Sequence, residues 1–224
     1  GAGIYLHHAE HCNISNNNPL NNYFGICLNF YSSNNIIASN NALNNNYGIA
    51  LGYSSSSNML IDNNASNNGW GICLWNSSNN TITNNIASIN IASNNSDGIH
   101  LCNSSNNIIT NNDVSNSSDK GIYLWNSSIN TITNNKVSNN EVGIFLSKSS
   151  DENIITNNNA SSNNYGIYLK YSSKSSIFNN TANFNRDDGI FLLNVTNTQI
   201  INCTVRNNDY GIDIGKSKNI TTVS

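Results

Sequence analysis

Charged residues are scarce in this sequence: Asp, Glu, Lys and Arg make up 9 % of its 224 residues, and only nine are Lys or Arg. A nucleic-acid groove needs clustered Lys and Arg, so the composition argues against that function. No apolar run approaches the ~20 residues of a membrane-spanning helix, and no signal peptide is recognisable. Disordered chains are usually charged and poor in aliphatic residues, whereas Ile is abundant and evenly spaced here, so one folded domain over 1–224 is expected.

One unit recurs from end to end of the chain, and Gly-Ile pairs set its phase. The pairs begin at Gly3, Gly25, Gly48, Gly71, Gly98, Gly121, Gly143, Gly166, Gly189 and Gly211. Eight of the nine intervals are 22 or 23 residues, and the one between Gly71 and Gly98 is 27. The four extra residues contain the near-duplicates IASIN and IASNN at 86–95, which predicts a longer loop just before Asp97.

Three short segments make up each unit. A Gly-Ile-x-Leu segment is followed about eleven residues later by Thr-Ile-Thr-Asn-Asn or a variant, and then by a third segment such as 136–138 or 204–206. Three strands and their polar turns leave no room for a helix in 22 residues. The sequence therefore predicts an all-β, single-stranded right-handed parallel β-helix of about ten coils, with three short strands per coil.

Alternation along each strand predicts which side chains face the core. In the segment 121–125, Ile122 and Leu124 point one way while Tyr123 and Trp125 point the other. With the aliphatic residues of the other two segments, about four aliphatic side chains per coil point inward. Stacking the coils buries them, at ~1.5–3 kcal/mol each before the cost in conformational entropy.

The cysteines form no regular framework. Cys27 and Cys73 fall at the same position of units two coils apart. Parallel strands lie ~4.8 Å apart, so these residues are separated by ~10 Å, too far for a disulfide. Free thiols are predicted.

Asn pairs recur at the end of the second segment. Asn tolerates the positive φ that a tight turn requires, and equivalent amides of stacked coils can hydrogen-bond to one another. We expect a structural ladder rather than a binding site. The pairs are Asn40-Asn41, Asn63-Asn64, Asn84-Asn85, Asn111-Asn112, Asn134-Asn135, Asn157-Asn158 and Asn179-Asn180.

The unit Gly-Ile-x-Leu…Ser-Ser-Asn-Asn-x-Ile-x-Asn-Asn resembles the parallel β-helix repeat of NosD-like proteins over essentially the whole chain. The resemblance implies a fold similar to that of pectate lyases and a place among archaeal or bacterial surface proteins. Some relatives of this kind act on polysaccharides, and the namesake is a periplasmic copper-delivery protein. The repeat itself specifies architecture far more than activity.

Aromatic residues gather at outward positions of the Gly-Ile-x-Leu segment. Sugar rings stack their C–H faces on aromatic rings, so this face is a candidate glycan-binding surface. Contact with a partner protein and simple strand packing are the alternatives. The candidate binding residues are Trp75, Tyr123, Trp125, Phe145 and Tyr168.

Acids gather in the turn before this segment. Asp119 and Glu141 are predicted to lie ~5 Å apart on successive coils, a separation that suits glycoside chemistry or Ca²⁺. Asp97 and His100 join them as catalytic candidates, since His serves as acid or base near neutral pH. The resemblance to pectate lyases places activity on this outer face, although acids at a solvated turn also simply confer solubility.

The segment His7-His8-Ala9-Glu10-His11-Cys12 holds several side chains of metal-binding type. His7 and His11 are the candidate ligands for copper, although they lie on opposite sides of a turn and the chain has one Met. No cofactor is otherwise expected.

Three functions follow as hypotheses. The first is an extracellular or cell-surface solenoid that contacts a glycan or a partner protein, with sequons such as Asn76-Ser-Ser as sites for attached sugars. The second is a polysaccharide lyase, hydrolase or epimerase, and the third is a metal-handling module. Because the chain begins at Gly1 and ends within a repeat, we expect either an excerpt of a longer protein or subunits that stack end to end.

Overall fold

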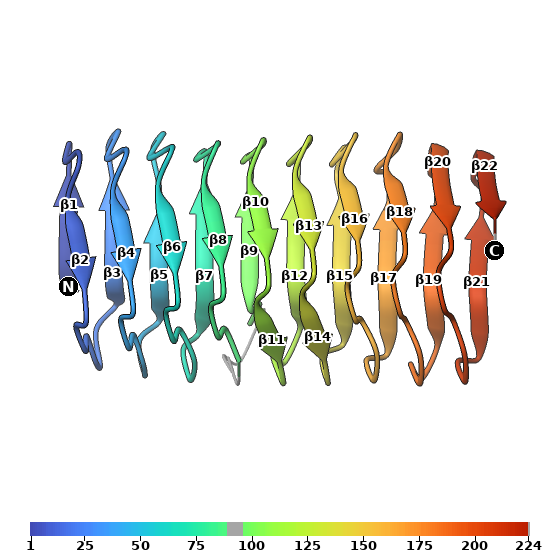
Figure 1. Ribbon diagram of the computed structural model, residues 1–224, viewed down its shortest axis with the longest axis horizontal. Helices are drawn as coiled ribbons and strands as arrows, with labels where there is room; N and C mark the ends of the chain where they lie inside the picture. The colour runs from blue at the N-terminus through green and yellow to red at the C-terminus, as the bar shows by residue number, and fades with distance from the viewer. Residues whose placement is uncertain (89–95, 224) are drawn as a thin grey trace.

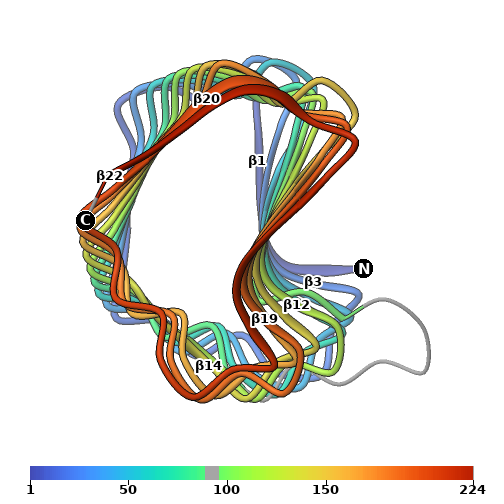
Figure 2. The same cartoon turned by 90° about the vertical axis from the view of Figure 1, so that its right-hand side faces the viewer.

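The computed structural model describes residues 1–88 and 96–223, and every regular element within those ranges is a β-strand. The loop predicted from the four extra residues falls largely at 89–95, outside the described residues. Two parallel sheets of ten strands each run along the molecule (Figure 1). Figure 2 looks along the stack and shows successive coils superposed. The fold is the all-β right-handed parallel β-helix predicted from the repeat.

The first sheet is built from the Gly-Ile-x-Leu segments and the second from the segments that follow them. The first sheet contains β1 (Ala2–His7), β3 (Phe24–Asn29), β5 (Tyr47–Leu51), β7 (Trp70–Trp75), β9 (Ile99–Cys102), β12 (Lys120–Trp125), β15 (Val142–Ser147), β17 (Tyr165–Lys170), β19 (Asp188–Leu193) and β21 (Tyr210–Gly215). The second contains β2 (Asn13–Ser15), β4 (Ile36–Ala38), β6 (Met59–Ile61), β8 (Thr81–Thr83), β10 (Ile108–Thr110), β13 (Thr131–Thr133), β16 (Ile154–Thr156), β18 (Ser176–Phe178), β20 (Thr196–Ile201) and β22 (Lys218–Val223).

The third segment is a strand in only two of the described coils, β11 (Asp113–Ser115) and β14 (Lys136–Ser138). Elsewhere it is reduced to single bridges such as Thr181 with Thr204, so the strand expected at 204–206 does not form. The inward residue of this segment is Val114 or Val137 in the two strands but Ala in most other coils. β-Branched side chains favour extended backbone, and the paired strands form where two successive coils both carry Val. Val205 also packs against the core, but the preceding coil carries Ala182 and only a single bridge forms there.

The core lies between the sheets and consists of stacked aliphatic side chains. In one coil Ile122, Leu124, Ile132 and Val137 are all fully buried, as the alternation predicted. Ile122 pairs with Ile99 on one side and Ile144 on the other, so each core position continues through neighbouring coils.

The Gly of every Gly-Ile pair except the last, Gly211, is required by close packing between coils. No described glycine has a positive φ, so backbone conformation does not explain it. A Cβ at Gly143 would lie 2.5 Å from the carbonyl oxygen of Gly166 and 2.8 Å from Nδ2 of Asn163. The pair therefore marks the place where coils approach most tightly.

The two residues of an Asn pair have different structural roles. Asn134 is exposed and adopts a φ of 55°, whereas Asn135 is buried and continues a ladder of amide hydrogen bonds. The predicted ladder is confirmed with side-chain distances of 2.9–3.1 Å, and its members are Asn40, Asn63, Asn85, Asn112, Asn135, Asn158 and Asn180.

The predicted alignment of the first two pairs was wrong by one residue. In those coils the ladder uses the first Asn of each pair, and Ser39 and Asp62 take the positive φ. The reason is that the ladder residue always lies three positions after the inward aliphatic, as Asn40 does after Ile37 and Asn135 after Ile132. A second Asn column, not recognised in the sequence, starts the second-sheet strands and includes Asn35, Asn58, Asn80, Asn107, Asn130 and Asn153.

Candidate functional site

The outer face of the first sheet carries three columns of side chains. One column stands just before the Gly, one between Ile and Leu, and one just after the Leu. In β3 these residues are Phe24, Cys27 and Asn29. Parallel pairing in register places each beside its equivalents on the adjacent coils, as Cys27 lies beside Ala50. The free state predicted for the thiols is confirmed, because all five cysteines are free.

An aromatic stack occupies the middle column over five coils. Its members are His100, Tyr123, Phe145, Tyr168 and Phe191, with successive ring centroids 4.7, 5.1, 4.9 and 4.7 Å apart. The structure thus brings together three predicted binding residues, Tyr123, Phe145 and Tyr168. Neighbouring rings cover much of each other's faces, so a ligand meets chiefly ring edges along this stack.

A second set of rings lies near the N-terminal end. Phe24, Tyr47 and Trp70 stack in the first column at 5.1 and 4.6 Å. Trp75 meets Tyr47 edge-on at 5.2 Å, so this predicted residue belongs to a different cluster from Tyr123. The first column was not predicted from the sequence, where aromatic residues were sought only after the Gly; an aromatic residue directly before the Gly was the available signal.

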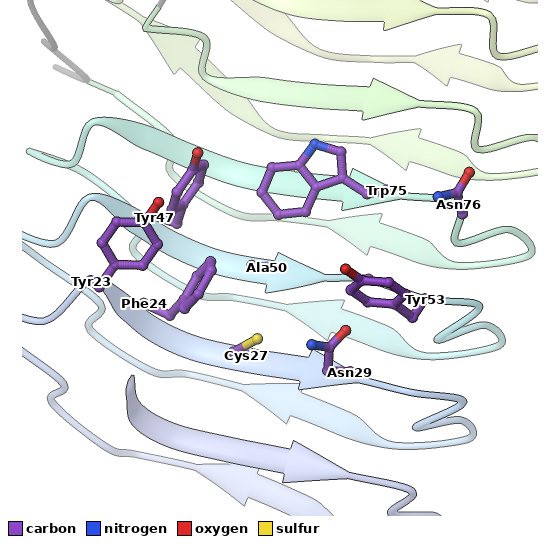
Figure 3. Close-up of a pocket in the computed structure, with 10 residues that line it drawn as sticks. Tyr23, Phe24, Cys27, Asn29, Tyr47, Ala50, Tyr53, Trp75 and Asn76 are labelled. Carbon is purple, nitrogen blue, oxygen red and sulfur yellow. The ribbon is translucent and has the colours of Figure 1, made fainter. Parts of the chain in front are cut away.

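These rings surround an N-terminal hollow of about 310 Å³. Its floor is made by the small residues Cys27, Ala50 and Gly52, next to the large side chain of Trp75. Figure 3 shows the rings around the open position of Ala50, with amides at one end of the hollow. The lining residues are Tyr23, Phe24, Cys27, Asn29, Tyr47, Ala50, Gly52, Tyr53, Trp75 and Asn76.

The N-terminal hollow carries no charge near neutral pH. Burial raises the pKa of the Cys27 thiol to about 11. Burial is also the main cause that raises the pKa of Tyr47, with smaller contributions from Cys73 and Tyr23. Polar contacts come from amides and phenols instead, and the buried Oδ1 of Asn29 accepts no hydrogen bond from the described residues. The hollow therefore offers apolar ring surface together with neutral polar groups.

The catalytic candidates Asp97, His100 and Asp119 gather around the end of the aromatic stack. His100 Nδ1 lies 3.0 Å from Oδ2 of the buried Asp97, whose Oδ1 accepts a hydrogen bond of 3.1 Å from the backbone N–H of Lys120. The Lys120 ammonium pairs with Asp119 and lies 5.1 Å from the Tyr123 ring centroid. None of these three candidates lines the N-terminal hollow.

Glu141 is exposed on the coil after Asp119 and lines a separate polar groove with Arg186 and several Asn and Ser residues. Its backbone N–H donates to the carbonyl oxygen of Asp119 at 2.8 Å. The Asp119 carboxylate itself is held by Lys120. The two acids therefore lie on adjacent coils, but the Asp119 carboxylate already forms an ion pair with Lys120.

A second hollow, the C-terminal hollow, has a volume of about 260 Å³. Trp125, Ser147 and Lys170 follow one another in the column after the Leu. The lining residues are Tyr123, Trp125, Phe145, Ser147, Lys148, Lys170 and Tyr171. All five predicted binding residues therefore lie on this face, and four of them line a hollow.

The metal candidates His7 and His11 differ in their surroundings. His7 packs against His8 and Phe30, while His11 is exposed in a turn with a φ of 56°. Within 1–88 and 96–223, no three His, Cys, Asp or Glu side chains are grouped in a way that would hold a metal ion. The same part of the chain contains no helix long and apolar enough to cross a membrane.

Acids also gather at the C-terminal end of the face. Asp188 is 5 % exposed, and burial raises its pKa to about 6, helped by the nearby charges of Asp213, Asp187 and Asp209. The folded state therefore holds a proton that the unfolded chain releases between about pH 4 and 6. Stability contributed by this proton is present at low pH and is lost as the pH rises through that window.

We expect Asp188→Asn to stabilise the fold by about 1–2 kcal/mol at pH 7.5 and by little at pH 4. The full shift corresponds to about 3 kcal/mol at 1.36 kcal/mol per pKa unit, and screening near the surface reduces it. Urea unfolding at both pH values measures the effect, with the exposed Asp62→Asn as the control. Equal stabilisation by Asp188→Asn at the two pH values would contradict the proton linkage.

Two family profiles match the chain. Residues 84–224 match the family described as "Right handed beta helix region", and residues 1–118 match "Periplasmic copper-binding protein (NosD)". No curated protein sequence matches.

Several solved structures share the fold. DFA-IIIase from Arthrobacter chlorophenolicus A6 in complex with GF2 aligns with a TM-score of 0.76 and 14 % identity over 89 % of this chain and 56 % of its own. A mutant of the periplasmic alginate epimerase AlgG gives 0.74 and 17 % over 89 % and 61 %. The Dettilon tailspike protein gives 0.61 and 15 % over 98 % and 61 %. The chain thus spans less than two thirds of each, and identities this low show the fold alone.

Proposed function

This chain belongs to the right-handed β-helix family and to the NosD family, and from that premise we propose that it is a β-helical scaffold whose first-sheet outer face binds polysaccharide. The periplasmic description of the NosD family supports a location outside the cytoplasm. Alginate, the substrate named for one structural relative, is itself a polysaccharide.

The N-terminal hollow is the observation that carries this proposal. Its size suits a sugar ring, with Trp75, Tyr47 and Phe24 offering apolar surface to the ring's C–H groups. The amides of Asn29 and Asn76 and the phenol of Tyr53 lie at its edge, within the same lining, and can bond to hydroxyl groups. Neutral surroundings of this kind favour an uncharged sugar unit over an ion.

We expect Trp75→Ala to weaken the binding of oligosaccharides by about 10- to 100-fold, because an aromatic wall contributes ~1–3 kcal/mol at such a site. A panel of oligosaccharides is first screened with the unchanged protein, and the best ligand is titrated by calorimetry. Tyr31→Ala is the matched control, since Tyr31 is exposed and lines neither hollow. Binding that survives Trp75→Ala unchanged would exclude the hollow as the site.

A polysaccharide-modifying enzyme is the second candidate, favoured by the Asp97–His100 pair beside Lys120 and Tyr123. A buried carboxylate that orients a histidine is a common arrangement for a general base. The ligands recovered from the binding experiment are therefore analysed for new reducing ends, unsaturated products and epimerised units. Unchanged ligands after long incubation would leave the binding role and remove the enzymatic one.

Copper handling and end-to-end assembly have less support. The described residues do not fit a copper site, since they contain no group of three suitable ligands and the chain has one Met. We therefore propose no copper function for this part of the chain. Stacking of like subunits through the coil ends stays a prediction, which sedimentation at several concentrations tests by the presence or absence of species larger than the monomer.

A further inference from the structure

The C-terminal hollow combines an aromatic wall with two lysines, Lys148 and Lys170, that have no carboxylate partner among the described residues. Ser147 is a small residue between Trp125 and Lys170 in one column, and this difference in size creates the depression. Lys148 and Tyr171 enter it from the turn that follows the strands, where both have a positive φ, 55° and 52°. The turn conformation thus directs both residues toward the same hollow.

The lysines of this hollow differ from three other lysines of the chain in having no carboxylate nearby among the described residues. Lys120, Lys136 and Lys174 each lie within ion-pair distance of a carboxylate. Lys148 and Lys170 have no such partner within 1–88 and 96–223, and no Asp or Glu lines the hollow. Two neighbouring cations without a counter-charge repel one another, so a bound anion would relieve this repulsion.

We propose that the C-terminal hollow is a second subsite, which binds a sugar unit carrying an oxyanion, either a carboxylate or a sulfate. Trp125 contacts the ring, and the ammonium groups of Lys148 and Lys170 bind the anionic group. Lysine acts as a compact point charge, so it accepts either anion without the planar geometry that Arg prefers. This inference rests on the proposed polysaccharide binding and adds the chemical class of the ligand.

The spacing of the two hollows fits one extended ligand. Trp75, Cys102, Trp125 and Ser147 pair in succession in one column, and Gly52 follows Leu51, whose partner Leu74 directly precedes Trp75. The floors of the hollows are therefore four coils apart. At ~4.8 Å per coil this is ~19 Å, a distance that a short oligosaccharide spans. The N-terminal hollow is uncharged and the C-terminal hollow is cationic. This matches a polysaccharide that contains both neutral and acidic sugar units, or one in which only some of the units carry an anionic substituent.

Calorimetric titration of three matched oligosaccharides tests the proposal: an oligouronate, its carboxyl-reduced neutral counterpart and a sulfated derivative of the latter. We expect at least one of the two anionic ligands to bind about tenfold or more tightly than the neutral one, and the preference to shrink at high salt. The double variant Lys148→Met/Lys170→Met should remove this preference while binding of the neutral ligand changes less than about twofold. The control Lys174→Met, at a lysine outside both hollows, should keep it.

The two anionic ligands distinguish a carboxylate subsite from a sulfate subsite. Equal affinity for charged and neutral ligands, or an anion preference that survives the double variant, would overturn the subsite. In either case Trp75-dependent binding of the neutral ligand would leave the proposed function standing. If no ligand of the three or of the wider panel binds, the proposed function fails together with the subsite.

Discussion

Replacing Asn135 by Ala is expected to lower the free energy of unfolding by about 3–5 kcal/mol. The buried Asn135 side chain accepts from the backbone N–H and the Nδ2 of Asn112, at 3.0 and 2.9 Å. It donates to the carbonyl oxygen of Ile109 at 2.9 Å and to Oδ1 of Asn158 at 3.0 Å. Its loss leaves buried donors and acceptors without partners on both neighbouring coils. Chemical unfolding followed by circular dichroism measures the change.

The matched control is Asn134→Gly at the adjacent position. Asn134 is exposed with a φ of 55°, a conformation that glycine adopts readily, so we expect a change below about 1 kcal/mol. Similar losses for the two variants would show that turn conformation, and not the amide ladder, stabilises this corner of the coil.

Gly143→Ala is expected to destabilise the fold by about 3 kcal/mol, because the added methyl overlaps backbone of the next coil. The Cβ would lie 2.5 Å from the carbonyl oxygen of Gly166, which cannot move without separating β15 from β17. Thermal and urea unfolding report the loss.

Gly215→Ala is the control for the general effect of replacing glycine. A Cβ there would meet Cδ1 of Leu193 at 3.2 Å, the end of a flexible side chain that can turn away. Both substitutions reduce the freedom of the unfolded chain equally, so the difference between them isolates the close approach of coils. A Gly143→Ala protein as stable as the Gly215→Ala protein would disprove the packing argument.

These two variants concern the same geometry that shapes the binding face. Ladders and glycine contacts hold successive coils in register. This register places Ser147 beside Trp125, and it brings Gly52, directly after the paired Leu51, into the same hollow as Trp75. A shift of one residue along a strand would turn the aromatic residues toward the core. The binding face therefore depends on the amides and glycines beneath it.

The sequence by itself determined the solenoid, the phase of its coils, the inward aliphatics and the two columns of the outer face that follow the Gly. It did so because residues 22 or 23 positions apart become neighbours in any regular stack, so that repetition alone assigns contacts such as Tyr123 with Phe145. The free thiols and the ladder role of Asn135 follow from the same column assignment.

Only the tertiary structure decided how those columns pack sideways. Spacing did not reveal that Asp97 orients His100, that Tyr47 meets Trp75 edge-on, or that the third segment is a strand only where two successive coils both carry Val. Nor did it reveal the two hollows, which arise from a small residue lying next to a tryptophan on the adjacent coil. These features depend on the volumes and torsion angles of several neighbouring side chains at once. The repeat pattern specifies the residue type at each position separately, so it does not contain this information.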